Sequence, residues 1–205
     1  MASLARIGLY SQLLLGCAST VHLARPAELQ IVIHDCSGLN PRTIGKGVSE
    51  LRAVLLFAKP NVDVAGCQDQ ANLASAESST DLRPLELWIL RDPAKKPKDS
   101  RRQPLGYSVV RDRGGHGVIF GQTVLSQANA GNVPWSLLFA YAAAHEIGHL
   151  VLGPSHSETG LMKPNWDRKD LQAMYRNSVH FSGEQKRSIV AYSGMSREIE
   201  MAQKR

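Results

Sequence analysis

The segment that most constrains the fold is residues 133–152, an apolar stretch that nevertheless carries two histidines and a glutamate. We expect a helix that begins at Val133-Pro134, with Asn132 as its N-cap, and ends before Gly153-Pro154. Three consecutive alanines and several leucines make this the most apolar helix of the chain, so we expect it to be buried. Buried imidazole and carboxylate groups need polar partners, and a metal ion with its water would satisfy them all.

The polar residues of this helix have the spacing of a metal site, His145-Glu146-Ile147-Gly148-His149. Residues four apart lie on the same face of a helix, so both imidazoles can reach one ion. Imidazole nitrogen is a ligand that suits zinc. Glu146 is rotated by about 100° from His145, which places its carboxylate beside the metal, where it can take a proton from water. The alternative is a chance occurrence on a surface helix, which the apolar surroundings argue against.

A third ligand is expected just beyond the helix, because a catalytic zinc normally takes three protein ligands and one water. His156 follows the end of the helix closely enough for the chain to turn back toward the metal. Glu158 and Asp167 are the alternatives for this position. The sequence contains no Ser-His-Asp set, P-loop or GxGxxG motif that would point to another chemistry.

Residues 145–164 resemble the active-site region of the metzincins, a metallopeptidase clan with the pattern HExxHxxGxxH followed by a turn that contains methionine. Residues 160–164, Gly-Leu-Met-Lys-Pro, resemble the matrixin-type Met-turn. Trp166 also fits the pattern of uncharacterised bacterial metzincin-like proteins, which the chain resembles most closely. The glycine and the third histidine lie one residue later than in the clan pattern, so the direction in which the chain leaves the helix is shifted by about 100°.

This resemblance implies a zinc-dependent endopeptidase that acts on a peptide or protein substrate. It implies Zn²⁺ held by His145, His149 and His156, a catalytic Glu146, and Met162 beneath the metal. Two other classes of function remain open: a non-catalytic zinc-binding or interaction module on the same fold, and a basic protein that binds nucleic acid or an anionic surface. The intact Glu146 argues against the module, because a purely structural zinc site needs no base.

The whole chain is expected to form an α+β fold with five strands and three helices. Strands are expected at 29–33, 61–67, 85–90, 105–110 and 117–124, and helices at 41–58, 133–152 and from Ser182 to about Tyr192. The resemblance implies a zincin-like, twisted mixed sheet whose antiparallel edge strand borders the cleft and binds substrate at Gly106, Tyr107 and Ser108. It also implies one catalytic domain over residues 26–205, with an upper subdomain at 26–153 and a small helical lower subdomain at 154–205.

The first 25 residues are typical of an export signal with its processing region, which predicts a secreted or periplasmic protein. Arg6 precedes a short apolar core, and small residues follow it. Leu14-Leu15-Gly16-Cys17 also resembles the bacterial lipobox, which would attach the protein to a membrane through a lipidated Cys17. An ordinary buried N-terminal helix is the alternative. Cys36 and Cys67 remain as an even pair, either one disulfide or two buried thiols.

The formal net charge of +6 leaves nucleic acid or an anionic surface open as partners. Much of this excess lies in residues 91–104, which hold six basic and two acidic residues. Three prolines interrupt this segment and no aromatic residue is interleaved with its basic ones, so we expect a solvated loop rather than a nucleic-acid site. The protein is accordingly expected to be a monomer that binds no nucleic acid.

Overall fold

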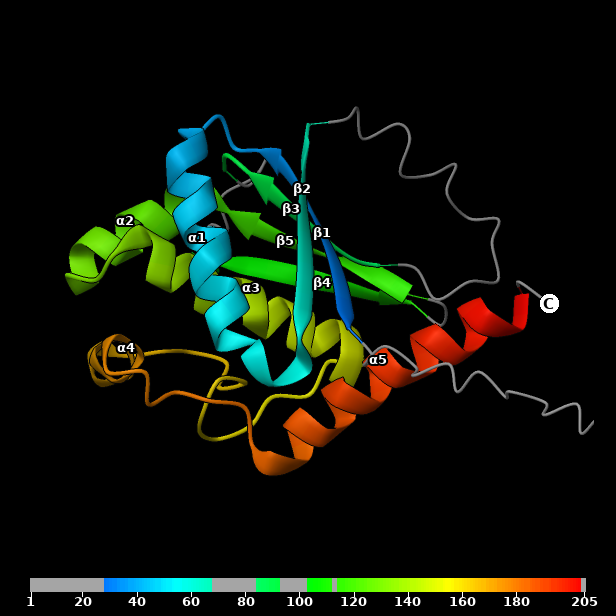
Figure 1. The fold of residues 1–205 in the computed structure, drawn as a ribbon. Coiled ribbons are helices and arrows are strands. Elements are labelled where there is room, and N and C mark those ends of the chain that lie inside the picture. The colour runs from blue at the N-terminus through cyan, green and yellow to red at the C-terminus, as the bar shows by residue number, and fades with distance from the viewer. Residues whose placement is uncertain (1–27, 68–83, 93–102, 112–113, 204–205) are drawn as a thin grey trace, which may run out of the picture.

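The computed structural model describes residues 28–67, 84–92, 103–111 and 114–203 of the chain (Figure 1). The expected export segment, which includes Cys17, and most of the basic segment at 91–104 lie outside these ranges. Within the described residues, no helix is both long enough and apolar enough to cross a membrane.

Five strands within the described residues form one mixed sheet with the order β2-β1-β3-β5-β4. They are β1 (Leu29–Cys36), β2 (Pro60–Gly66), β3 (Leu85–Leu90), β4 (Gly106–Arg111) and β5 (Gly114–Phe120). Strands β1, β2, β3 and β5 are parallel, whereas β4 is antiparallel to β5 and lies at the edge of the described sheet. The prediction of a five-stranded mixed sheet is confirmed.

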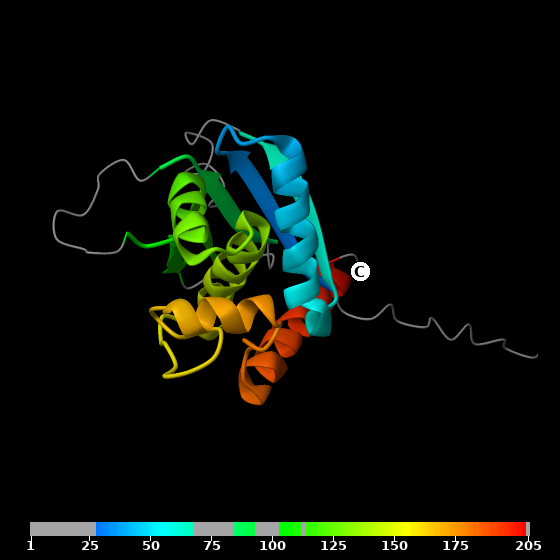
Figure 2. The same ribbon diagram turned by 90° about the vertical axis from the view of Figure 1, so that its left-hand side faces the viewer.

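In the part of the chain that the structure describes, five α-helices and one short 3₁₀ helix connect and cover the strands. They are α1 (Pro41–Val54), η1 (Leu56–Ala58), α2 (Gly121–Gly131), α3 (Trp135–Leu152), α4 (Arg168–Tyr175) and α5 (Gly183–Gln203). Helix α5 begins with a capping box, because the Ser182 N–H donates to Gln185 Oε1 at 2.8 Å and the Gln185 N–H donates to Ser182 Oγ at 3.2 Å. Both views place α4 and α5 below α3, so the lower part of the molecule is helical (Figures 1 and 2).

The start of α3 and the end of β5 differ from the sequence-based prediction. The strand expected at 117–124 ends at Phe120, where the unpredicted helix α2 begins at once. Asn132 is not the N-cap of α3, because it has a φ of 53° and its backbone N–H closes the last turn of α2. Asparagine is favoured both at N-caps and at left-handed C-caps, so its type alone does not distinguish the two roles. Pro134 is the N-cap of α3 instead.

One face of the sheet and the helices α1 and α3 enclose the main core. The sheet contributes alternate residues to this core, and α3 is buried on nearly all sides, as predicted. Helix α1 approaches α3 closely at Gly47, where an added Cβ would lie 2.5 Å from the Phe139 ring. The opposite face of the sheet has a separate cluster, with Trp88, Val118 and Phe120 at its centre. The two faces of β4 therefore have different surroundings, and only one of them faces α3.

A disulfide joins Cys36 at the end of β1 to Cys67 just beyond β2. The Cα atoms of the two residues are 4.7 Å apart. Parallel pairing of β1 with β2 brings the carboxyl ends of both strands together, which is why two cysteines separated by 31 residues meet there. The structure thus shows that this pair forms one disulfide and not two buried thiols.

Replacing both cysteines, in the variant C36S/C67S, is expected to lower the free energy of unfolding by about 3–4 kcal/mol, because a closed loop of this length restricts the unfolded chain. Urea unfolding monitored by circular dichroism measures the difference. The wild-type protein with its disulfide reduced should match the variant. Equal unfolding midpoints for the oxidised wild type and the variant would show that the cross-link adds no stability.

Candidate metal centre

Helix α3 brings two histidines and a glutamate into the interior. His145, Glu146 and His149 are 8%, 6% and 7% exposed, respectively. The Nε2 atoms of His145 and His149 are 3.0 Å apart, and the two rings meet nearly at right angles with their centroids 4.6 Å apart. The two Nε2 atoms are therefore close enough to bind one ion, as their spacing in the sequence predicted.

His156 reaches the same point from the loop after α3. Its Nε2 lies 3.2 Å from Nε2 of His149. The chain leaves the helix at Gly153, whose φ of 88° is one that residues with a side chain rarely adopt. The chain turns at this glycine, and His156 reaches His149 although one additional residue lies between the second and third histidines. Of the described residues, these three histidines form the group with metal-ligand potential, and neither Glu158 nor Asp167 belongs to it.

Asp167, one of the alternative ligands, has a structural role instead. It is the N-cap of α4, and its carboxylate accepts hydrogen bonds from the backbone N–H groups of Lys169 and Asp170. Helix α4 has only eight residues, too few for a hydrophobic period to be recognised, and it was not predicted. Its capping box, Asp167 with Asp170, is the signal that could have revealed it.

The hydrogen bonds of the imidazoles show that the three-histidine cluster fits a metal ion. Nδ1 of His145 lies 2.9 Å from the Leu161 carbonyl oxygen, and Nδ1 of His149 lies 3.0 Å from the Gly153 carbonyl oxygen. A carbonyl only accepts, so Nδ1 of each ring carries a proton. In the form of imidazole that binds a metal, Nε2 is unprotonated, and the lone pairs of the two Nε2 atoms then point toward each other. Such lone pairs repel unless a cation lies between them. A tetrahedral zinc with Zn–N bonds of 2.0–2.1 Å would place its nitrogens about 3.3–3.4 Å apart, close to the spacing found.

Burial favours the neutral form of His145 and His156, which is the form that a metal ligand must have. Burial lowers the pKa of His145 to about 4, with the Leu161 carbonyl acting in the opposite direction and the charges of His149 and His156 adding to the decrease. Burial also lowers the pKa of His156, and the charge of His149 lowers it further. At neutral pH, therefore, both rings are available as ligands.

The Glu146 carboxyl lies beside the histidines and is held by the edge strand. Burial raises the pKa of Glu146 to about 7, while a hydrogen bond from Ser108 acts in the opposite direction. A bound dication would lower this pKa, because an opposite charge favours the ionised form. A carboxyl group that can both take up and release a proton near neutral pH is suited to general acid–base chemistry.

Met162 contacts α3 between the two histidines of this helix. Its side chain is 1% exposed and contacts α3 at Gly148, the residue just before His149. A Cβ at Gly148 would collide with Sδ of Met162 and lie 3.0 Å from the Phe181 ring. The same turn supplies the Leu161 carbonyl that orients His145. Glycine at position 148 thus allows the Met162 side chain to pack directly against α3.

Gly148→Ala is expected to destabilise the protein by about 1–3 kcal/mol, because the added methyl group overpacks the contact with Met162. Gly45→Ala is the matched control, since Gly45 also lies in a helix and has nothing within 4 Å of an added Cβ. This control should stabilise the protein slightly through its helix propensity. Thermal unfolding of both variants measures the difference, and equal effects would contradict the close packing at Gly148.

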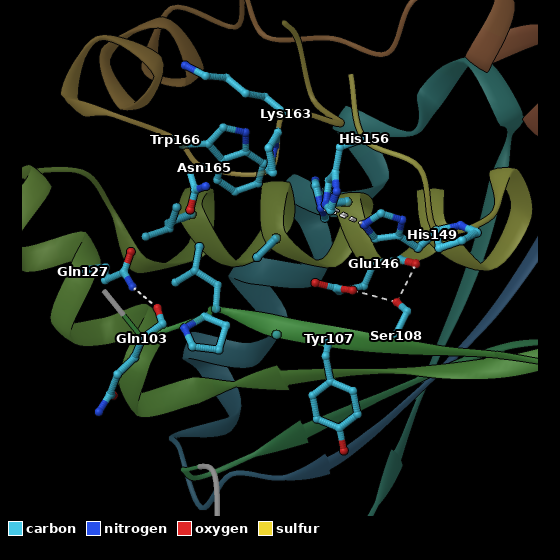
Figure 3. Close-up of a pocket in the computed structure, with 18 of the residues that line it drawn as sticks. Gln103, Tyr107, Ser108, Gln127, Glu146, His149, His156, Lys163, Asn165 and Trp166 are labelled. Carbon is cyan, nitrogen blue, oxygen red and sulfur yellow. Dashed lines mark hydrogen bonds between the residues drawn. The ribbon is translucent and has the colours of Figure 1, made fainter. Parts of the chain in front are cut away.

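The three histidines and Glu146 open into a cleft of about 450 Å³ (Figure 3). Strand β4 borders one side of it, and the segment from Lys163 to Trp166 borders the other. Beyond the histidines the cleft continues past α3 to Gln127 of α2 and Leu171 of α4. Sequence reasoning missed these two residues because it missed both helices that carry them.

The three residues predicted on the edge strand have different positions. Ser108 points toward Glu146, whereas the Tyr107 side chain points to the other side of the sheet (Figure 3). Tyr107 lies there near Phe120, with ring centroids 5.9 Å apart, and is 46% exposed. Gly106 faces the cleft on the same side as Ser108. The strand therefore offers its backbone and Ser108 to the cleft, while the phenol of Tyr107 faces away.

Comparison with known proteins adds a finding about the fold. No family model matches the sequence, and no curated protein matches it. Among solved structures, a zinc-dependent peptidase from Methanocorpusculum labreanum aligns with a TM-score of 0.54 and 15% identity over 78% of this chain and 99% of that one. Archaemetzincin from Methanopyrus kandleri aligns with a TM-score of 0.56 and 13% identity over 83% of this chain and 98% of that one.

The fold of this chain is similar to the folds of that zinc-dependent peptidase and of archaemetzincin. At such low identity the likeness concerns the fold alone, and the function has to be argued from the site. Both structures are covered almost completely, so the likeness concerns their whole fold and not one motif alone. The matrixin-like character of residues 160–164 stays a prediction.

Proposed function

We propose that the chain is a zinc-dependent endopeptidase. His145, His149 and His156 would hold the zinc, Glu146 would act as the general base, and Met162 would support the ligands from below. The observation that carries this proposal is the convergence of three imidazole Nε2 atoms beside a buried carboxyl at the edge of an open cleft. The likeness in fold to zinc-dependent peptidases supports it independently.

The chain's own groups account for the proton transfers of peptide hydrolysis. Zinc, when bound, would supply polarisation of the scissile carbonyl and acidification of the attacking water. The Glu146 carboxylate takes the proton of that water as its oxygen attacks the carbonyl carbon. The same carboxyl then delivers the proton to the leaving amine, which regenerates the carboxylate. The net reaction consumes one water and breaks one peptide bond. Burial of Glu146 favours the first step, because it raises the proton affinity of the carboxylate. With a pKa of about 7, the carboxyl can still give up this proton to the more basic amine.

The position of β4 supports a substrate that binds in an extended conformation. An edge strand presents unpaired backbone groups with which a peptide can pair as a further strand. Since β4 borders the cleft, a peptide beside it would lie extended past the histidines. This geometry favours cleavage inside a chain over removal of single terminal residues.

We propose in addition that the protein works outside the cytoplasm. The Cys36–Cys67 disulfide supports export, since disulfides persist in oxidising compartments. The expected signal segment and the lipid attachment at Cys17 lie outside the described residues and stay predictions.

The proposed function is tested by measuring bound zinc and peptide cleavage on the purified protein. A library of peptides with acetylated N-termini and amidated C-termini, analysed by mass spectrometry, reports internal cleavage because exopeptidases need free ends. We expect one zinc per chain, internal cleavage, loss of cleavage on chelation and its return with added zinc. A protein that holds one zinc and cuts no peptide or unfolded protein would instead be a non-catalytic zinc-binding module.

A further inference from the structure

Ser108 of β4 meets Glu146 where the edge strand passes α3. Its Oγ lies 2.6 Å from Oε2 of Glu146 and 3.0 Å from the backbone carbonyl oxygen of the same residue (Figure 3). The shorter distance falls in the range of about 2.5–2.7 Å that is typical of a hydroxyl donating to an ionised carboxylate. The hydroxyl has a single hydrogen, so the carboxylate is its preferred acceptor and the carbonyl is a weaker alternative.

Two glycines on the strands make this contact geometrically feasible. Gly117 of β5 pairs directly with Ser108, and a Cβ there would lie 3.1 Å from the Glu146 Cβ and 2.5 Å from the Leu87 side chain. Gly106 lies two residues before Ser108 on the same face, and a Cβ there would lie 3.2 Å from Oε1 of Glu146. The absence of side chains at both positions lets the helix approach the sheet until the serine hydroxyl reaches the carboxylate.

The two oxygens of the Glu146 carboxylate consequently have different environments. Oε2 accepts the hydrogen bond from Ser108, while Oε1 accepts none from the residues that the structure describes. Oε1 lies over Gly106, beside the cleft that both residues line. The terminal torsion of a glutamate has a broad energy minimum, so an untethered carboxylate would turn freely about this bond. The hydrogen bond to Oε2 selects one orientation.

We propose that Ser108 is a positioning residue, whose hydroxyl fixes the Glu146 carboxylate so that Oε1 faces the position of the attacked peptide. This inference rests on the proposed peptidase function. Both hydrogen bonds that the Ser108 hydroxyl can form go to Glu146, so its effect on the reaction passes through that residue. The edge strand thus has two tasks, because it borders the substrate cleft and also orients the base that serves it.

Ser108→Ala tests the inference through separate measurements of kcat, KM and zinc affinity. Since small misplacements of a catalytic group are costly, we expect kcat to fall by about tenfold or more, while KM and zinc affinity change by less than about twofold. Ser178→Ala is the matched control, because Ser178 also donates from its hydroxyl to a carbonyl, that of Ala173, away from the cleft. It should leave kcat unchanged. If S108A does not fold, S108C provides the same comparison with a weak donor of similar size.

A double variant shows whether the effect passes through Glu146. In the E146Q background, adding S108A should lower the residual rate by less than about twofold, since no base remains to be oriented. Each of three results would overturn the inference. They are a full tenfold loss of rate in the E146Q background, an unchanged kcat in S108A alone, and an effect of S108A that is confined to KM.

A crystal structure of zinc-free S108A gives a readout that is independent of activity. We expect the Glu146 carboxylate to leave the position it has in the wild type, and an unchanged position would contradict the positioning role. Failure of the wild type to cleave any peptide would overturn the proposed function instead. Cleavage by the wild type with normal kinetics in S108A would overturn the inference alone, so the two failures are distinguishable.

Discussion

Glu146→Gln is expected to lower kcat for peptide cleavage by about two to four orders of magnitude, the usual contribution of a general acid–base group. The amide keeps the size of the carboxyl and can still contact Ser108, but it cannot take up a proton from water. Because Glu146 is not one of the three proposed zinc ligands, the variant should still bind one zinc per chain. Metal analysis and steady-state kinetics on the same preparation measure both quantities.

Glu158→Gln serves as the control for this substitution. Glu158 lies in the loop after His156, is exposed, and is outside the three-histidine cluster. We expect its kcat and zinc content to equal those of the wild type. A Glu146→Gln variant that cleaves peptides at the wild-type rate would show that another group acts as the base, and loss of zinc would show that Glu146 is a ligand.

His149→Ala is expected to abolish zinc binding and, with it, all activity. His149 has the central position in the cluster, since its Nε2 lies 3.0 Å from that of His145 and 3.2 Å from that of His156. Zinc present at a hundred times its Kd should stabilise the wild type by about 2.7 kcal/mol, and the variant should lose this stabilisation. Thermal unfolding with and without zinc detects the loss directly.

His180→Ala is the matched control for the histidine substitution. His180 is exposed and contributes its backbone carbonyl, not its ring, to the hydrogen bond with the Leu161 N–H. This variant should keep the zinc-dependent shift of the melting temperature. Retention of a full equivalent of zinc by His149→Ala would contradict the proposed ligand set.

Local sequence patterns predicted the parts of the site that depend on one element. His145 and His149 share a helix, so their spacing alone determines that they meet. The position of His156 depends on how the chain leaves the helix, and the left-handed conformation of Gly153 is not encoded by the spacing. Because of the extra residue in that segment, the sequence did not determine the direction in which the chain turns. The structure shows that Nε2 of His156 lies 3.2 Å from Nε2 of His149.

Contacts between distant segments could not be derived from the sequence. Ser108 and Glu146 are 38 residues apart, and their contact depends on the order of the strands and on two glycines that admit the helix. The sequence indicated that Ser108 lies on the edge strand, but it did not reveal that the hydroxyl meets the base. Helix α2 was missed for a local reason, because its glycines and polar residues give little helical signal and Asn132 fits the start of the next helix as well.

The central claim is that three imidazoles hold one zinc ion, and the most direct test is a crystal structure of the zinc-loaded protein with anomalous scattering measured at the zinc edge. We expect one anomalous peak about 2.0–2.1 Å from Nε2 of each of His145, His149 and His156, with the fourth position open to water or substrate. An absent peak in protein saturated with zinc, or a peak whose ligands exclude any of the three histidines, would contradict it.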